Sequence, residues 1–471
     1  MNVIQKLKST FKASMLNCDN VKVYAISGYG KLVSNMTAIV YNKSMILIDA
    51  GKGMEIPDKW TYLSTKNLSK LIPITPNVKY LDNFLDNGYK VEALIITHPH
   101  GDHIGGIQEV YKYLLTKGYD KSSIPLYCSS FTNEFGKKSI PGWSSYDFRK
   151  LEEDMECVVE KNVCKFYPFF LGHSSYHSAA LYFTIKNKTI LFLPDHKRDY
   201  DNYIGPNQLE IDKRLGLIFK EGVDALILEA TSVLAFKEKT LLNKNLPEGA
   251  IYTGLRSKIC SLSQRSHNIF VSSYSTNPAR IKSVIDAGRL VGKTVAIYGR
   301  GMWNGYSAAL NEGLFDPKDC EHVIKLEDST ALNKGGYIVM LTGHMGEGQA
   351  KLNKLLRNVD PYEWHRKDKI ILASTVIPKE GAIFSRSCLM NVILSKRIEF
   401  FTGEDTPGLH TSGHIGYNDY VYYVNVIRNC KKVVINHGDR KEQLQILAIA
   451  DFHNVDPGIF HLISDGQCIQ V

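Results

Sequence analysis

The 471-residue sequence has no run of about 18 apolar residues, so it predicts no membrane-spanning helix. Its N-terminus also lacks the uninterrupted hydrophobic block of a secretory signal, because Lys6, Lys8 and Lys12 break the apolar positions. The nine cysteines are odd in number, scattered and never spaced CxxC, which argues against a disulfide framework and against a thiolate zinc site. We therefore expect a cytoplasmic protein with no membrane partner.

A strong charge imbalance is missing as well. The chain has 57 Lys and Arg against 48 Asp and Glu, a net charge of +9. This mild basic excess is compatible with a polyanionic partner such as a nucleic acid, and equally with no such partner. The apolar fraction of 44% is ordinary for a chain that buries a core, which excludes wholesale disorder, collagen and coiled coils. A chain of this length corresponds to about two to four domains.

Short apolar runs bounded by turn residues predict strands in the first part of the chain. These predicted strands cover residues 21–27, 36–41, 45–49, 93–97, 223–228 and two stretches within 182–193. A helical pattern covers 104–115. From about residue 232 strands and helices alternate, at 269–273, 279–290 and 294–298, and the last strand of that section is expected at 369–373. The first pattern then returns, with strands predicted at 421–428 and 433–435. We therefore expect one α/β domain, interrupted by a second α/β domain and then resumed.

The sharpest motif is the run HPHGDH, which directly follows a predicted buried strand. It places four metal-competent side chains, those of His98, His100, Asp102 and His103, within one short loop. A lone histidine is more often a structural residue than a ligand, but this clustering reverses the odds. Imidazole and carboxylate groups suit a borderline ion such as zinc, so the loop predicts a metal site.

This HxHxDH loop after a strand resembles the signature of the metallo-β-lactamase fold. The strand end Asp49-Ala50-Gly51 is similar to the family's Asp-Gly, with one residue inserted. The family's third histidine is matched by His173, with His177 as the alternative ligand. Its bridging aspartate is matched by Asp195, which follows Pro194 where the family usually has glycine.

Further motifs, in order along the chain, resemble the β-CASP branch of this fold and within it ribonuclease J. They lie at residues 34–37 (SNMT), 273–277 (SYSTN) with Arg280, 298–302 (YGRGM), 342–347 (TGHMGE), 377–378 (IP), 410–414 (HTSGH) and 436–438 (NHG). His344 stands where the family has serine, and the sequence gives no physical reason for this change. The resemblance implies a metallo-β-lactamase αββα sandwich interrupted by an inserted β-CASP α/β domain. The expected parts are residues 1–231 for the sandwich, 232–378 for the β-CASP domain and 379–471 for the resumed sandwich.

The resemblance also implies a ligand set for two zinc ions, with manganese or magnesium as alternatives. One ion would be held by His98, His100 and His173. The second would be held by Asp102, His103 and His437, with Asp195 bridging the two. Glu229, His414 and His437 fall at the first, second and third β-CASP motifs.

The implied reaction is hydrolysis of RNA phosphodiester bonds by a hydroxide that two metals activate, in endonucleolytic and 5′-to-3′ exonucleolytic modes. Asp102 and Asp195 are expected to serve it through the metals. His414 would stabilise or protonate the leaving oxygen, and Glu229 would orient a neighbouring histidine. A phosphate cradle is expected from the backbone around Ser412 and Gly413 together with Asn277 and Arg280.

Other functions compete with this interpretation. A DNA nuclease of the same fold would have the same ligands. A lactonase or thioesterase is disfavoured because the insert at 232–378 would cover the metal site with a nucleic-acid groove. An inactive RNA-binding scaffold would normally have lost ligands, and none is lost here. We expect an RNA substrate and a basic surplus on the cleft walls that includes Arg280 and Arg300, with a homodimer as one possible assembly.

Overall fold

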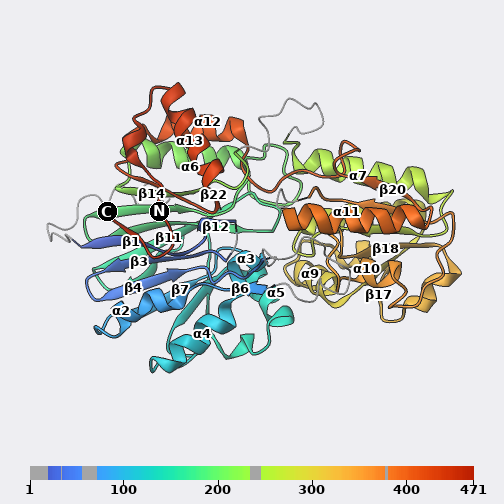
Figure 1. Cartoon of the computed structure of the whole chain (residues 1–471), viewed down its shortest axis with the longest axis horizontal. Helices are drawn as coiled ribbons and strands as arrows, with labels where there is room; N and C mark the ends of the chain where they lie inside the picture. Colours follow the sequence, from blue (N-terminus) through green and yellow to red (C-terminus); the bar gives the residue numbers. More distant parts are fainter. Residues whose placement is uncertain (1–19, 33, 56–71, 234–244, 377–379) are drawn as a thin grey trace.

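A computed structural model describes residues 20–32, 34–55, 72–233, 245–376 and 380–471. The chain forms two lobes, of which one contains both ends of the described chain (Figure 1). In that lobe the last strand, β24 (Cys468–Gln470), pairs antiparallel with the first, β1 (Val21–Ser27). The C-terminal part of the chain therefore returns to complete the domain that the N-terminal part begins.

Two seven-stranded sheets build this first domain. The first sheet has the order β24-β1-β3-β4-β7-β8-β9. Besides β24 and β1 it contains β3 (Met36–Tyr41), β4 (Ser44–Ile48), β7 (Lys90–Ile95), β8 (Pro125–Cys128) and β9 (Asp147–Lys150). The second has the order β10-β11-β12-β13-β14-β21-β23, formed by β10 (Cys157–Glu160), β11 (Cys164–Leu171), β12 (Ser178–Ile185), β13 (Lys188–Leu193), β14 (Ala225–Glu229), β21 (Val433–Asn436) and β23 (Phe460–His461).

Three separate hydrophobic clusters show that these sheets form an αββα sandwich. One cluster joins the inner faces of the two sheets, with Ile39 and Ile46 from the first sheet against Phe166 and Phe183 from the second. The outer face of the first sheet packs against α4 (Ile107–Thr116). The outer face of the second sheet packs against α6 (Gln208–Glu221), α12 (Tyr417–Val426) and α13 (Arg440–Phe452). The expected sandwich is confirmed.

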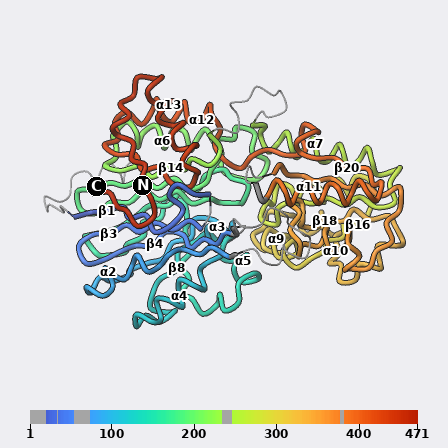
Figure 2. Tube along the Cα trace, viewed as in Figure 1, coloured from blue at the N-terminus to red at the C-terminus, as the bar shows by residue number. Residues whose placement is uncertain are grey.

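The second domain is built on a six-stranded sheet in which every neighbouring pair is parallel. Its order is β17-β16-β18-β15-β19-β20, formed by β17 (Val323–Leu326), β16 (Thr294–Tyr298), β18 (Tyr337–Leu341), β15 (Ile269–Ser272), β19 (Lys369–Leu372) and β20 (Glu399–Thr402). The helices α7 (Glu248–Ser263), α8 (Pro278–Val291) and α9 (Arg300–Asn311) cover one face, and α10 (Lys351–Leu356) and α11 (Glu380–Ser395) cover the other. Figure 2 follows the chain through this lobe, which is yellow-green to orange.

The second domain extends further along the chain than predicted. Strand β20 pairs in parallel with β19, so the strand predicted at 369–373 is not the last of this sheet. The expected boundary at residue 378 is therefore wrong, because the inserted domain continues to at least Thr402. The matched dipeptide Ile377-Pro378 lies outside the described residues.

The strand predicted at 421–428 is also wrong, because the segment lies in helix α12 and in the 3-10 turn that follows it, η6 (Ile427–Asn429). Its β-branched and aromatic residues favour a strand by intrinsic preference. However, Asp419 accepts a hydrogen bond from the backbone N–H of Gly416 at the start of the helix, and Tyr420, Tyr423 and Val424 pack into the core beside the second sheet. Tertiary packing therefore overrides propensity here. No helix of the described residues is long and apolar enough to cross a membrane.

Candidate metal centre

The HPHGDH segment forms the loop that leaves β7 at the edge between the two sheets. His98 and His100 lie on the extended part, and α3 (Gly101–Ile104) then carries Asp102 and His103. Because the chain changes from extended to helical within this loop, side chains from both conformations can face one centre. His98 is fully buried, and Asp102 keeps 30% of its side-chain surface exposed.

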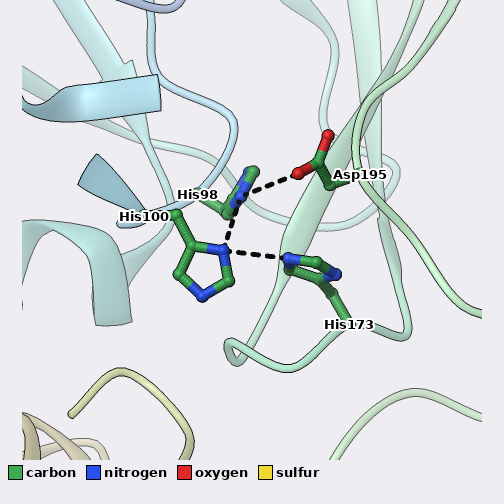
Figure 3. Close-up of side chains that lie close together, drawn as sticks. All are labelled: His98, His100, His173 and Asp195. Atoms are coloured by element: carbon green, nitrogen blue, oxygen red, sulfur yellow. Dashed lines mark hydrogen bonds and ion pairs between the residues drawn. The ribbon is translucent and has the colours of Figure 1, made fainter. Parts of the chain in front are cut away.

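A first group of four possible ligands surrounds one point (Figure 3). The Nδ1 atom of His100 lies 3.2 Å from His98 Nε2 and 3.0 Å from His173 Nε2. Asp195 Oδ2 lies 3.8 Å from His98 Nε2. His173 follows the second-sheet strand β11, and Asp195 follows β13 of the same sheet. The two sheets therefore supply two ligands each.

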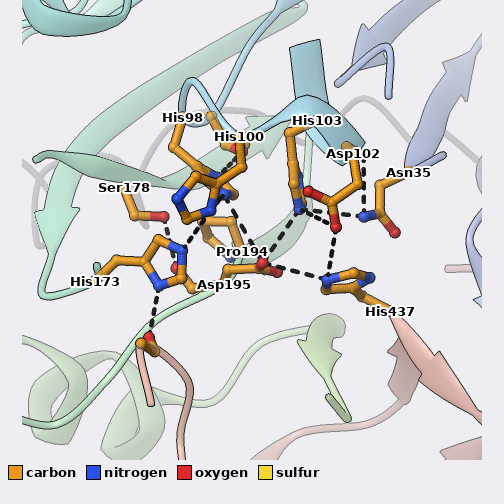
Figure 4. A network of polar contacts seen from close by, with 12 residues as sticks. Asn35, His98, His100, Asp102, His103, His173, Ser178, Pro194, Asp195 and His437 are labelled. Carbon is orange, nitrogen blue, oxygen red and sulfur yellow. Dashed lines mark hydrogen bonds and ion pairs between the residues drawn. The ribbon is translucent and has the colours of Figure 1, made fainter. Parts of the chain in front are cut away.

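A second group of four shares Asp195 with the first (Figure 4). Asp195 Oδ2 lies 3.2 Å from His103 Nε2 and 3.2 Å from His437 Nε2. Asp102 Oδ2 lies 3.9 Å and 3.5 Å from the same two nitrogens. The structure thus brings together all seven side chains that the resemblance implied, with Asp195 common to both groups. That they are ligands stays a prediction.

The hydrogen bonds behind the first group leave nitrogen lone pairs facing inward. His173 Nδ1 donates to the carbonyl oxygen of Gly413 at 2.5 Å, and His98 Nδ1 lies 3.1 Å from the hydroxyl of Thr97. A ring proton on each Nδ1 leaves the Nε2 lone pair free. Two such lone pairs then face Nδ1 of His100 at close range, where a single ring proton would have to be shared between them, whereas a cation between the rings would be bound by all three nitrogens. The residues therefore fit a divalent metal, for which neutral imidazole and carboxylate are suitable ligands.

Asp49 lies beside the cluster, although the sequence assigned it no role. It is buried, its Oδ2 accepts from His103 Nδ1 at 2.8 Å, and its Oδ1 accepts from the backbone N–H of Thr97 at 2.8 Å. Carboxylates in this position fix the ring orientation of a metal-binding histidine and raise its basicity. A sequence feature that could have identified Asp49 is its place as an acid at the end of a fully buried strand, just before the loop that packs on the HPHGDH segment.

Burial and mutual repulsion keep the first three histidines neutral. Burial lowers the pKa of His100 and of His173 to about 3, and neighbouring histidines contribute to the lowering. Burial likewise puts the pKa of His98 well below its usual value. Burial raises the pKa of Asp195, but His437, His103 and His414 outweigh this and hold the pKa well below its usual range. The first group therefore presents neutral imidazoles beside an ionised carboxylate, which is the protonation state that metal binding requires. In the second group burial lowers the pKa of His103, but its carboxylate neighbours, Asp195 foremost, raise it well above its usual value, so this ring would have to release a proton to bind a metal.

Backbone close to the cluster is tightly packed and in part strained. Asp49 and His437 have φ angles of 63° and 42°, a left-handed region that residues other than glycine rarely occupy. The backbone N–H of Asp49 donates to Ile95 at 2.8 Å, which holds its conformation. At Gly51 a Cβ atom would lie 1.8 Å from the carbonyl oxygen of Asp102. Only a glycine at position 51 therefore lets the chain after β4 approach the HPHGDH loop so closely.

Glu229 and the half-buried His414 form a pair beside Asp195. Glu229 ends β14, is fully buried, and its Oε2 accepts from His414 Nδ1 at 2.7 Å. Its Oε1 accepts from the backbone N–H of His196 at 2.8 Å. Burial lowers the pKa of His414, but the carboxylates of Glu229 and Asp195 raise it to about 9. The expected arrangement, with Glu229 orienting a histidine near the metals, agrees with this geometry, while the chemical role of both residues stays a prediction.

The loop 410–414 lies against the cluster, but its contacts differ from a simple phosphate cradle. Ser412 is half-buried and its Oγ accepts from the backbone N–H of His414 at 3.1 Å. Gly413 is buried, and a Cβ there would lie 2.7 Å from the side chain of Ser174. The carbonyl oxygen of Gly413 is the acceptor for His173, so its first role is to position that ring. Substrate contacts by these two residues stay a prediction.

Arg280 and Asn277 are inside the protein, so their prediction as substrate contacts is wrong. Arg280 is fully buried, and its five N–H groups donate to both carboxylate oxygens of Glu248, to the carbonyl oxygens of Ala373 and Thr411, and to Nδ1 of His410, all at 3.1–3.2 Å. Asn277 is 1% exposed and its side chain accepts from the backbone N–H of Arg280, which begins helix α8. No donor of Arg280 is left for a phosphate, and Arg280 therefore does not lie on a cleft wall.

Two other histidines that the sequence singled out lie outside the cluster. His177 stacks on Phe170 with the ring centroids 4.0 Å apart, so the structure brings His173 and not His177 to the metal site. His344 is 2% exposed, and its ring centroid lies 4.4 Å from that of Tyr274 in an edge contact. Burial lowers the pKa of His344 to about 3, with Arg386 and Arg280 contributing, so this ring is neutral.

Comparison with known protein families matches both domains. The family described as "Metallo-beta-lactamase superfamily" matches residues 29–115, and that described as "Ribonuclease J, beta-CASP domain" matches residues 266–388. The first match contains the HPHGDH loop, and the second contains most of the six-stranded sheet. The chain therefore has a metallo-β-lactamase domain with a β-CASP domain of the ribonuclease J type inserted into it.

Relatives of known name are similar over nearly the whole chain. Ribonuclease J of Methanocaldococcus jannaschii is 24% identical over 95% of this chain and 98% of its own length. Ribonuclease J of Pyrococcus abyssi is 24% identical over 89% of this chain and 90% of its own length, and ribonuclease J 1 of Streptococcus pyogenes is 25% identical over 91% and 70%. A solved structure, a protein of unknown function from Enterococcus faecalis, covers 96% of this chain and all of its own with a TM-score of 0.59 at 14% identity, which supports the fold alone.

Proposed function

Because this chain is a metallo-β-lactamase-fold protein that carries a β-CASP domain of the ribonuclease J type, we propose that it is a metal-dependent ribonuclease. It hydrolyses phosphodiester bonds of RNA, in endonucleolytic and 5′-to-3′ exonucleolytic modes. The observation that carries the proposal is the pair of ligand groups that share Asp195, within a chain that contains both matched domains.

We further propose that the metals are two zinc ions, with manganese or magnesium as alternatives. His98, His100, His173 and Asp195 would hold one ion, and Asp102, His103, His437 and Asp195 would hold the other. When bound, such a pair supplies an activated water for attack and neutralises charge on the phosphate. Histidine-rich ligand sets suit zinc better than they suit magnesium.

The proton for the leaving oxygen is assigned to His414. Its Nδ1 donates to Glu229, so Nε2 is the atom that can donate to the leaving oxygen of the cut strand. Glu229 and Asp195 favour the protonated ring, which keeps this donor charged at neutral pH. Glu229 is a positioning residue, because its second oxygen is held by the backbone of His196 and cannot rotate away.

Cleavage of 5′-monophosphorylated RNA, measured with and without a chelator, tests the function. We expect loss of activity on chelation and recovery on adding zinc or manganese. Asp102→Ala and His103→Ala should abolish the recovery, while Asp120→Ala, which changes an exposed acid on another loop, should not. Activity that survives both ligand substitutions would refute the mechanism.

Matched RNA and DNA strands in the same assay separate the proposal from a DNA nuclease, which would cut the DNA strand faster. Labels at the 5′ end and inside the strand separate the two modes, since only exonucleolytic attack releases a labelled mononucleotide first. A cytoplasmic location and a homodimer also remain proposals. Cell fractionation and light scattering of the purified chain test them.

A further inference from the structure

The inserted domain has a cavity of about 480 Å³ that contains none of the metal-cluster residues. It lies at the carboxyl ends of β16 and β17, where α9 begins. Tyr298 and Gly299 end β16 on one side of the cavity, and Lys325 and Leu326 end β17 on the other. In open parallel α/β sheets ligands bind outside the carboxyl ends of the strands, and this cavity lies at that edge of the sheet, beside β16 and β17 and away from the reversal of strand order between β18 and β15.

Three cations line this cavity: Arg300, Lys325 and Lys351. Lys325 pairs at 2.5 Å with Glu327, a carboxylate that also lines the cavity, and Lys351 pairs with Asp360 at 2.6 Å. Arg300 is exposed, and no carboxylate of the described chain lies within ion-pair distance of it. A guanidinium without a partner at the mouth of a cavity is suited to an anion that carries planar acceptor oxygens, above all a phosphate.

An aromatic side chain lies beside these charges. Trp303 is half-buried in the cavity wall, and Lys325 Nζ lies 5.9 Å from the centroid of its ring. Aromatic rings next to basic groups bind single-stranded nucleic acid, because the ring stacks on a base while the cation holds a phosphate. An inorganic anion such as phosphate has no ring that could stack on the indole of Trp303.

The cavity lies at the same edge of the sheet as the residues of the inserted domain that are linked to the metal centre by hydrogen bonds. The carboxyl end of β19 meets Arg280 through the carbonyl oxygen of Ala373, and Arg280 also bonds to the loop that holds His173. With strands about 4.8 Å apart, the space between β16 and β17 lies roughly 10–15 Å along this edge from β15.

The cavity also adjoins the junction of the two domains. Asn304, in its wall, donates to the backbone oxygen of Lys138 at 2.8 Å and to Ser139 Oγ at 3.2 Å. Lys138 and Ser139 belong to the end of α5 (Ser130–Ser139) of the first domain, and Figures 1 and 2 show α5 beside α9. The exposed side chain of Lys138 adds a further positive charge next to the junction.

We propose that this cavity binds one nucleotide of the RNA strand at a distance from the bond that is cut, with its phosphate on Arg300 and its base on Trp303. The inference rests on the proposed function, because it takes RNA as the substrate. It adds a second contact point for the strand, which lies on the inserted domain and is separate from the metal cluster. Short RNA that ends before the cavity does not use this contact, and longer RNA does.

The test measures RNA binding by the metal-free chain of 471 residues, so that no strand is cut. Fluorescence anisotropy is recorded over a range of salt with RNAs of about 4 and about 16 nucleotides, the ends of the range for single-strand sites. The variant is Arg300→Ala. The matched control is Arg366→Ala, which removes the same charge from an exposed residue that precedes β19, at the opposite edge of the sheet.

For the long RNA we expect Arg300→Ala to weaken binding and to lower the slope of log affinity against log salt by about 1, the effect of one lost phosphate contact. Trp303→Leu should weaken the same RNA by about fivefold or more. The short RNA should bind to Arg300→Ala as to the unchanged protein, and Arg366→Ala should leave both RNAs unaffected.

Equal effects of Arg300→Ala and Arg366→Ala on the long RNA would overturn the proposal. It would also be overturned if AMP or UMP alone bound in the cavity in an Arg300-dependent manner while RNA binding did not depend on Arg300, since the ligand would then be a free nucleotide. A failure of the proposed function is distinguishable from both results. In that case the metal-loaded protein would not cut RNA, whatever the binding measurements gave.

Discussion

The buried position of Arg280 leads to a prediction about stability. Replacing Arg280 by methionine keeps much of the side-chain volume and removes all five donors. Glu248, whose side chain is 5% exposed, then loses its bidentate partner, and burial of an uncompensated charge costs about 3–5 kcal/mol. For a domain of this size that free energy corresponds to a fall in melting temperature of about 6–20 °C.

Thermal unfolding of the metal-free protein, followed by circular dichroism, measures this effect. The matched control is Arg289→Met in the same helix, whose guanidinium is 54% exposed and pairs with Asp319. Exposed pairs contribute at most about 1 kcal/mol, so this variant should melt close to the unchanged protein. The double variant Arg280→Met with Glu248→Leu should recover much of the loss, because both charges are then removed together.

The outcome also decides between two roles of Arg280. If it contacted RNA, Arg280→Met would weaken RNA binding with little change in melting temperature. A melting temperature within about 2 °C of the unchanged protein corresponds to no more than about 1 kcal/mol. That result, combined with weaker binding, would refute the internal role derived from its hydrogen bonds.

Three further predictions concern the metal centre. Asp49→Asn should lower metal affinity by about 10–100-fold, because the carboxylate that orients His103 is lost, and chelator competition would contradict this if the affinity were unchanged. Glu229→Gln removes a carboxylate that raises the pKa of His414, so the protonated ring should be lost at a lower pH and the alkaline limb of the pH–rate profile should move down from about 9; an unmoved limb would count against His414 as the proton donor. Gly51→Ala should abolish metal binding, whereas Gly101→Ala, where a Cβ meets nothing within 4 Å, should leave the metal content measured by mass spectrometry unchanged; equal effects would show that the close packing at Gly51 is not what the metal loop requires.

Most of the strands and the candidate ligands could be predicted from the sequence because their signals are local. The strands predicted at 21–27 and 36–41 match β1 and β3 residue for residue. The HPHGDH loop contains four of the candidate ligands within one short segment. The more distant candidates His173, Asp195 and His437 depended on a resemblance, because each is a single residue after a strand, and only the fold brings these strand ends together.

The wrong predictions have physical causes that no short stretch of sequence can reveal. Arg280 looks like a phosphate contact in the sequence, but its partner Glu248 lies on another helix and becomes visible only when α7 packs on α8. The boundary predicted at 378 is too early because β20 is short and follows a helix, so its sequence resembles a return to the first domain. Segment 421–428 has strand-forming residues whose helical state is imposed by the core beneath it.

The loop 410–414 gives the two domains a shared mechanical element. Its Thr411 carbonyl is tied to Arg280 of the inserted domain, and two residues later its Gly413 carbonyl receives the Nδ1 proton of His173. A hinge motion that carried the loop away with the inserted domain would leave that proton without its acceptor and free the imidazole to rotate. By thermodynamic reciprocity, anything that holds His173 in this orientation, a bound metal included, would also favour the arrangement of the two domains in which Gly413 accepts its proton.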